Sequence, residues 1–308
     1  MRAAILIQPG AEPEVGSFGE PTVTDGQVPV EVAAAGLNPV DLYLASGNLG
    51  PPDTPRVVGQ EGVGRLEDGR RVYFNPSVPP YGSWAERTLV EPERVWDVPE
   101  ELSDGQAVAM GIPALAAWLS LEHHARLVQG EDVLVLGATG VVGQIAVQAA
   151  SLLGAGHIVG AGRNPDRLED AARVGADTTV VLGGDDDARA LRDAASGDGY
   201  DVVIDPVYGA PFEAALAASS TGARLVTIGG SGGQSAEVPF RRLQGRTHIG
   251  HANVALPTPV VRDAYEKLTR HAAEGRIGVD VETFSLDRAQ DAWRAQEDGP
   301  HHKLVVVP

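Results

Sequence analysis

The sequence predicts an α/β protein in which a doubly wound parallel sheet lies between two β-rich segments. Residues 109–255 alternate short apolar runs with helical stretches, which is typical of a parallel sheet covered by helices. Residues 1–108 show alternating apolar positions, with dense Gly and Pro between 47 and 82, which indicates strands joined by turns. Residues 256–308 return to mixed helix and strand, so we expect this tail to fold back onto the first domain.

The individual elements follow from the same patterns. An apolar run at 1–9 predicts the first strand, and alternation predicts strands at 28–34 and 71–74. Strands of the parallel sheet are expected at 133–136, 158–161, 179–182, 202–205 and 224–228. The tail is expected to hold a helix at 258–274, a strand at 279–284, a helix at 287–296 and a strand at 304–307. We therefore expect one domain at 109–255 and another at 1–108, completed by 256–308.

Composition excludes several classes of protein. The chain has 308 residues, a net charge of −18 and no cysteine. Without cysteine there are no disulfides, thiolate metal sites or thiol nucleophiles. The acidic balance argues against nucleic acid as a partner, since binding phosphates needs a basic patch. No apolar run reaches the length of a membrane span, so we expect a soluble, cytoplasmic protein with no membrane association.

The turn after the apolar run 133–136 is the most informative motif. Val133–Gly143 reads as strand, glycine-rich turn and helix start, the context that a dinucleotide fingerprint requires. Gly140 lets the backbone approach a pyrophosphate, Gly143 lets the helix pack closely, and free N–H groups at the helix start face the phosphates. Ala138 replaces the first fingerprint glycine. The candidate cofactor-binding residues here are Gly137, Ala138, Gly140, Val141, Val142 and Gly143.

This string also suits short-chain reductases and sugar epimerases, in which it normally lies near the N-terminus. Here about 130 residues precede it, and neither Lys267 nor Lys303 has a Tyr four residues before it, as their Tyr-x-x-x-Lys motif requires. A purely structural strand–helix turn is the other alternative.

The choice of cofactor depends on the residues after the next strand. An NAD enzyme would carry Asp or Glu there to bind the ribose 2′-hydroxyl, but this strand ends in Gly162 and Arg163. Arg163 and Arg167 could pair with a 2′-phosphate, which favours NADPH. Alternatively both arginines face solvent at a helix start, because Asn164–Asp166 reads as N-cap, N1 proline and first-turn acid.

Two further strand ends are candidates for the same ligand. Asp205 and Gly229 each end an apolar run, and ligands of doubly wound sheets collect at the carboxyl ends of the strands. We expect Gly229 and Gly230 to let the backbone approach the nicotinamide. Asp205 is a further candidate for cofactor binding, although with Pro206 it could form only a turn.

The chain resembles the medium-chain dehydrogenase/reductase superfamily, and within it the zinc-free quinone oxidoreductase branch, also called zeta-crystallin-like. The segments that carry the resemblance are Ala33–Tyr43, Val58–Gly64, Tyr81–Glu86, Asp201–Gly209 and Gly222–Gly229. The resemblance implies a Rossmann-type NADPH-binding domain and a β-rich GroES-like catalytic domain. Zinc enzymes of this superfamily use a Cys and a His where this chain has Asn38 and Gln60, so no metal is expected. An aromatic residue common in the branch is Leu49 here.

The resemblance also suggests which residues act on the substrate. Asn38, Pro39 and Asp41 read as an ordinary helix start: N-cap, N1 proline and first-turn acid. In the family this helix start faces the nicotinamide, which makes Asn38 and Tyr43 candidate catalytic residues. The Tyr43 phenol could donate a hydrogen bond to a developing oxyanion, whereas Asp41 is expected to be structural.

These inferences predict an NADPH-dependent oxidoreductase that transfers hydride to a quinone or an α,β-unsaturated carbonyl without zinc. A non-catalytic NADPH-binding protein, of crystallin or sensor type, is the alternative, because it would carry the same cofactor site. The resemblance further implies a homodimer, formed through the apolar stretch 239–259. Its Ile249, Val254 and Leu256 would be unfavourable to leave exposed.

Overall fold

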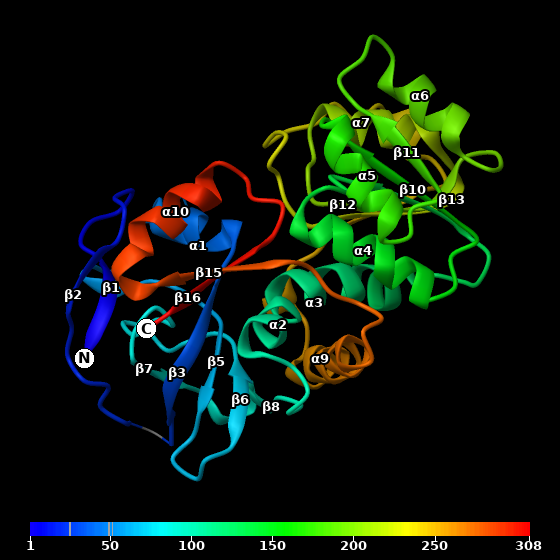
Figure 1. Cartoon of the computed structure of the whole chain (residues 1–308). Coiled ribbons are helices and arrows are strands. Elements are labelled where there is room, and N and C mark those ends of the chain that lie inside the picture. Colours follow the sequence, from blue (N-terminus) through cyan, green and yellow to red (C-terminus); the bar gives the residue numbers. More distant parts are fainter. Residues whose placement is uncertain (25, 49, 51) are drawn as a thin grey trace. The chain divides into compact units, whose positions relative to one another are not determined.

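The computed structural model describes residues 1–24, 26–48, 50 and 52–308, and Leu49 lies outside this set (Figure 1). The chain forms two compact units. Unit 1 consists of Met1–Ile112 and Tyr265–Pro308, and unit 2 of Pro113–Ala264. The boundaries fall four and nine residues after those expected from the sequence. The second lies inside helix α9 (Thr258–Ala273), where no break in the hydrophobic pattern marks it.

Unit 2 contains the parallel sheet that the sequence predicts. Its order is β11 (Thr178–Val181), β10 (His157–Gly162), β9 (Asp132–Leu136), β12 (Tyr200–Asp205), β13 (Ser219–Thr227) and β14 (Thr247–Gly250). Each of these pairings is parallel. Strands β9 and β12 are neighbours in the sheet although they are not consecutive in sequence. Strands β9 to β11 extend the sheet to one side of this pair, and strands β12 to β14 extend it to the other. This is the strand order of the doubly wound Rossmann fold, and it confirms the predicted fold class.

The helices of unit 2 connect these strands. They are α3 (Ile112–Leu119, which begins at the last residue of unit 1's first segment), η2 (Ser120–Ala125), α4 (Val141–Leu152), α5 (Pro165–Arg173), α6 (Asp187–Ala194), α7 (Ala210–Ala218), α8 (Phe240–Leu243) and η3 (Asn253–Ala255). Strand β9 is buried at every position, as expected for the centre of a sheet covered on both faces. Its carboxyl end leads directly into the glycine-rich turn.

Unit 1 is β-rich. One sheet has the order β15 (Val281–Ser285), β16 (Lys303–Val307), β3 (Val28–Leu37), β5 (Gly62–Arg65), β6 (Arg71–Phe74) and β8 (Val95–Asp97), with β7 (Arg87–Val90) also pairing β3. A second sheet has the order β2 (Glu14–Ser17), β1 (Arg2–Leu6) and β4 (Arg56–Val57). The helical elements are α1 (Pro39–Ala45), η1 (Pro92–Arg94), α2 (Asp104–Ala109), η4 (Leu286–Arg288) and α10 (Ala289–Glu297).

The tail contributes directly to the first sheet. Strand β16 pairs antiparallel with β3, with Leu304 opposite Leu37 and Val306 opposite Ala35. Helix α10 packs on these strands (Figure 1), and its Trp293 meets Trp84 edge-on, with ring centroids 6.0 Å apart. Both indoles are almost fully buried. Residues from both ends of the sequence therefore share one hydrophobic core.

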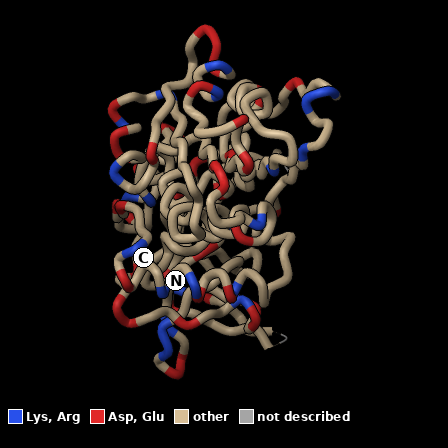
Figure 2. Tube along the Cα trace, turned by 90° about the vertical axis from the view of Figure 1, so that its right-hand side faces the viewer, with Lys and Arg blue, Asp and Glu red and all other residues tan. Residues whose placement is uncertain are grey.

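Charged residues of both signs are interspersed over the two units (Figure 2). Among the described residues, no helix is both long and apolar enough to cross a bilayer. The acids Asp186 and Asp187 have local roles at the start of α6. Asp186 accepts from the backbone N–H of Arg189, and Asp187 accepts from those of Gly183 and Gly184.

Candidate functional site

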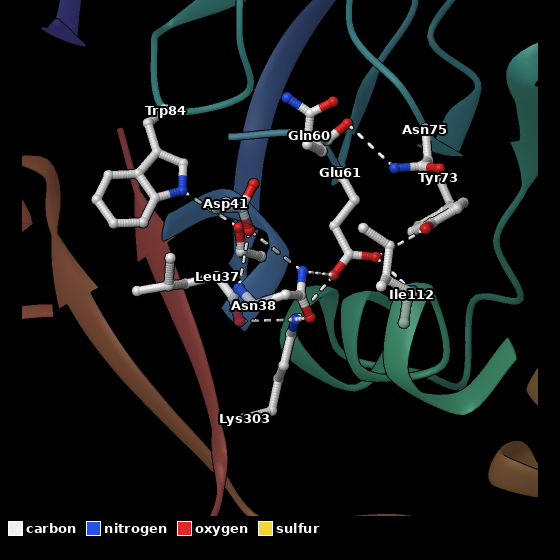
Figure 3. Close-up of polar contacts among 12 residues, drawn as sticks. Leu37, Asn38, Asp41, Gln60, Glu61, Tyr73, Asn75, Trp84, Ile112 and Lys303 are labelled. Atoms are coloured by element: carbon white, nitrogen blue, oxygen red, sulfur yellow. Dashed lines mark hydrogen bonds and ion pairs between the residues drawn. The ribbon is translucent and has the colours of Figure 1, made fainter. Parts of the chain in front are cut away.

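Helix α1 begins at the residues that the sequence predicts. Asn38 is the N-cap residue and Pro39 is at N1, as predicted. The Asn38 backbone N–H donates to Asp41 Oδ2 at 2.8 Å, so Asp41 caps the helix from its N3 position. The Asn38 side chain makes only a long contact with the helix, from Nδ2 to Asp41 Oδ2 at 3.5 Å, and its shorter hydrogen bonds are with Glu61 and Lys303 (Figure 3). Its role is therefore set by partners distant in sequence.

Glu61 is the centre of a buried polar cluster that the sequence did not reveal. It lies just before β5 and is fully buried. Its Oε1 accepts from Asn38 Nδ2 at 2.8 Å and from Lys303 Nζ at 2.7 Å. Its Oε2 accepts from the Tyr73 hydroxyl and from the Ile112 backbone N–H, both at 2.7 Å (Figure 3). Both carboxylate oxygens are thus satisfied by donors, as an ionised buried acid requires.

Lys303 is the cationic partner in this cluster. Only 1% of the residue is exposed, and its Nζ donates to Leu37 O at 3.1 Å, Asn38 Oδ1 at 2.6 Å and Glu61 Oε1 at 2.7 Å. Strand β16 places it there, because its neighbour Leu304 pairs opposite Leu37. All three ammonium protons have acceptors. The Asn38 amide therefore has protein partners on both its oxygen and its nitrogen.

Tyr43 has the opposite environment. It lies on α1 one turn after Pro39 and is 40% exposed. Its hydroxyl has no hydrogen bond to any described residue. The two candidate catalytic residues therefore differ: Asn38 is bound within the protein, whereas Tyr43 has a free donor on a short helix whose start is fixed.

The turn after β9 has the geometry of a phosphate cradle. Gly137 has φ of +58°. A Cβ on Gly143 would lie 2.1 Å from Gly137 O and 2.6 Å from Ala138 Cα, so only glycine permits this packing of helix and turn. A Cβ on Gly140 would meet nothing closer than 3.5 Å. Gly140 is the N-cap of α4 and supplies no capping side chain, so no side chain caps the first-turn N–H groups of Val141, Val142 and Gly143.

The residues after β10 are placed as the sequence predicts. Gly162 ends β10, and a Cβ on it would crowd Thr139 and Leu168 at 3.2 and 3.3 Å. Asn164 caps α5 by accepting from the Arg167 backbone N–H. Arg163 is exposed and forms no ion pair with any described residue, whereas the Arg167 guanidinium lies 3.6 Å from Asp170 Oδ2. Of the two arginines, Arg163 is therefore the one without an ion-pair partner among the described residues.

Asp205 organises the loops at the sheet edge. It is fully buried at the end of β12, where its carboxylate accepts from the Val207 and Tyr208 backbone N–H groups at 2.9 and 2.8 Å and from the Thr227 hydroxyl at 3.1 Å. Burial raises the pKa of Asp205, while these hydrogen bonds act in the opposite direction. Its oxygens are committed to the protein, which favours a turn-forming role over direct contact with a cofactor.

The glycines after β13 lie against this turn. A Cβ on Gly229 would lie 2.8 Å from Pro206 O, and one on Gly230 would lie 3.0 Å from Gly233 O. The Gly232 N–H donates to Val207 O at 2.7 Å, which joins the two loops. Their backbones form one rim above the carboxyl ends of β12 and β13.

The histidines form contacts that local sequence did not predict. His124 is half-buried, and its Nε2 lies 3.0 Å from His251 Nδ1. His251 Nε2 is 2.7 Å from Asn253 Oδ1, and burial lowers the pKa of His251 to about 4. Across the described residues, no group of three or more His, Asp and Glu side chains is arranged to hold a metal ion.

Comparisons with known proteins agree with this architecture. A family model described as "Zinc-binding dehydrogenase" matches residues 141–273, which excludes the positions of Asn38 and Gln60. Quinone oxidoreductase of Sus scrofa is 31% identical over 224 residues, covering 69% of this chain and 67% of that protein. A phenolphthiocerol/phthiocerol polyketide synthase of Mycobacterium tuberculosis is 30% identical over 299 residues, covering 91% of this chain. The chain spans only 13% of that relative's length.

The structure of Escherichia coli quinone oxidoreductase complexed with NADPH superimposes with a TM-score of 0.91 at 23% identity, covering 100% of both chains. A GroES-like unit together with a Rossmann-type unit of this strand order defines a class of two-domain dehydrogenases and reductases. Within that class, the chain belongs to the medium-chain dehydrogenase/reductase superfamily, in its quinone oxidoreductase branch.

Proposed function

We propose that the protein is an NADPH-dependent oxidoreductase that transfers hydride to a quinone or an α,β-unsaturated carbonyl without zinc. The observation that carries this proposal is the turn at Gly137–Gly143, which presents uncapped N–H groups at the start of α4. Family membership supports the same reaction class, since relatives are named quinone oxidoreductases. The related Escherichia coli enzyme is described as complexed with NADPH.

In this proposal, each part of unit 2 has a distinct binding task. The N–H groups of Val141, Val142 and Gly143 bind the pyrophosphate, aided by the helix dipole. Arg163 pairs with the 2′-phosphate, with Arg167 as a second cation. Gly229 and Gly230 allow close approach to the nicotinamide, and Asp205 fixes the facing loop. Bound NADPH would supply the hydride.

Unit 1 acts on the substrate oxygen. Addition of hydride leaves negative charge on that oxygen, and the Tyr43 hydroxyl donates a hydrogen bond to it. Asn38 holds the helix start in place through Lys303 and Glu61. This positioning role is proposed in place of the direct catalytic role that the sequence suggested for Asn38.

Metal independence is part of the proposal. Amide oxygens are poor zinc ligands compared with thiolate or imidazole, and Asn38 Oδ1 already accepts from the Lys303 ammonium. A zinc ion beside Asn38 would also meet the positive charge of that ammonium group.

The test is a turnover assay with NADPH, NADH and a panel of quinones and enones, with and without a strong chelator. We expect NADPH oxidation that depends on the acceptor and survives chelation. Tight NADPH binding without turnover of any acceptor would favour the non-catalytic alternative. Activity lost on chelation and restored by zinc would show that the metal proposal is wrong.

A further inference from the structure

A second polar feature of unit 1 lies beside the Glu61–Lys303 cluster. It is a partly open recess between helix α1 and the segment 56–60, with a volume of about 10 Å³. The polar side chains that line it are Asp41, Arg56 and Gln60, and the apolar ones include Leu6, Leu44 and Val58. Its volume is about the minimum for one water molecule.

The two oxygens of Asp41 have very different surroundings. Asp41 is 4% exposed, and its Oδ2 accepts from the Asn38 backbone N–H at 2.8 Å. Its Oδ1 is buried and has no partner among the described residues. An ionised carboxylate left without donors on one buried oxygen is unfavourable, whereas a neutral acid needs only an acceptor for its proton. No described residue accepts a proton from Oδ1, so the acceptor that a neutral Asp41 needs would have to lie in the recess that Asp41 lines.

Burial of Asp41 favours the same state. Lys303 on β16 and Glu61 before β5 are paired at 2.7 Å, so the Lys303 ammonium is already neutralised by a carboxylate other than Asp41. Burial raises the pKa of Asp41 to about 7, with Glu61 adding to the rise and Lys303 opposing it. Arg56 on β4 attracts Asp41, but its guanidinium forms no hydrogen bond or ion pair with any described residue.

The polar groups that line the recess, on Asp41, Arg56 and Gln60, suit a neutral molecule that both donates and accepts hydrogen bonds. A cation would be repelled by Arg56, and an anion would gain little beside an acid that ionises near neutral pH. A water molecule can accept from Asp41 Oδ1–H and from the Arg56 guanidinium, donate to the Gln60 side-chain oxygen, and keep one proton to donate outward.

We propose that this recess holds one water molecule and that Asp41, acting through that water, supplies the proton that follows hydride transfer. The proposal rests on the proposed function and identifies a proton source for the same site. Hydride forms the new C–H bond and leaves an oxyanion on the substrate. The water gives a proton to that oxyanion and takes the Oδ1 proton of Asp41. The resulting carboxylate faces Arg56 and regains a proton from solvent.

Asp41 then has a measurable signature without any substrate. Infrared difference spectra of the purified protein should contain the carbonyl band of a protonated, buried carboxylic acid that disappears as pH rises through neutrality. Asp41→Asn keeps an oxygen for the Asn38 N–H and should remove this band. Asp97→Asn, at an exposed acid of the same unit, should leave it unchanged. Absence of a titrating band in the unmodified protein would overturn the proposal, whether or not the protein is an enzyme.

The kinetic arm tests the proton-donor role. Because the acid must be protonated, turnover should fall as pH rises through the pKa of Asp41. Asp41→Asn should lower turnover at pH 6 by ~10-fold or more, which is the effect expected of losing a general acid. It should also remove that pH dependence.

Arg56→Gln removes a positive charge near Asp41, which should raise the pKa of Asp41. The fall of turnover with rising pH should therefore move to higher pH. A merely structural role for Arg56 would not shift this fall. An unchanged pH profile in both variants, with the infrared band present, would overturn the role of Asp41 as proton source. Lack of turnover with every acceptor would instead refute the proposed function and leave the infrared result standing.

Discussion

Replacing Lys303 by Met tests whether the buried cluster holds unit 1 together. The substitution keeps much of the side-chain volume but removes the ammonium group, leaving the carboxylate of Glu61 fully buried without its cation. Breaking a buried ion pair on one side typically costs about 3–5 kcal/mol. Glu61 would keep its donors from Asn38, Tyr73 and Ile112, so we expect a loss at the lower end of that range, about 3 kcal/mol.

The measurement is the free energy of unfolding of unit 1 in urea. Tryptophan fluorescence suits it, since Trp84, Trp96 and Trp293 lie in unit 1 and only Trp118 lies in unit 2. Two units can give two transitions, which must be fitted separately.

Two comparisons decide the interpretation. Adding Glu61→Gln to Lys303→Met removes the uncompensated charge, and this double variant should recover at least about 1 kcal/mol relative to the sum of the single losses. Arg70→Met, which breaks only the exposed contacts to Asp68 and Asp97, should cost less than about 1 kcal/mol. A loss for Lys303→Met as small as that for Arg70→Met, or strict additivity in the double variant, would refute the reasoning.

Three further predictions concern the proposed function. Arg163→Ala should weaken NADPH binding by about 1–3 kcal/mol and leave NADH binding nearly unchanged, measured by fluorescence titration; equal losses for both would remove Arg163 from the 2′-phosphate site. Tyr43→Phe should lower kcat by ~10-fold or more at constant NADPH affinity, and a kcat like that of the unmodified protein would exclude the hydroxyl as oxyanion donor. The protein should sediment as a homodimer at micromolar concentration, because edge strand β14 and the exposed Val254 (66%) and Phe240 (75%) offer an apolar edge. A monomer whose mass does not change on Val254→Asp would contradict that assembly.

The sequence predicted the elements of unit 2 well because each is encoded locally. A short apolar run marks each strand from β9 to β13, and Gly140 with Gly143 marks the turn and helix start. Asn164 and Pro165 likewise mark the start of α5. Such signals depend on neighbours a few residues away, so no tertiary information is needed to read them.

The buried cluster of unit 1 could not be predicted in the same way. Asn38 looks like an ordinary N-cap, but its side chain binds Lys303, 265 positions away in sequence. Lys303 precedes a run of Leu and Val, where local pattern alone would place a charged residue at an exposed strand end. Glu61 lies in segment 58–64, one of the segments that resemble the family, but nothing in that segment indicated the residues that Glu61 binds. His124 and His251 were missed for the same reason, since 127 positions separate them.

The position of β16 in its sheet has a consequence for synthesis of the chain. Unit 2 is one continuous stretch, whereas unit 1 joins Met1–Ile112 to Tyr265–Pro308. When residues 1–112 have left the ribosome, Glu61 and Asn38 exist without the ammonium group that neutralises and orders them. Since domains generally fold as units in the order of their synthesis, unit 2 can complete its fold before unit 1. Until residue 303 is made, residues 1–112 cannot complete the fold of unit 1. During that time Glu61 lacks its cationic partner, and the edge of β3 that pairs with β16 stays open.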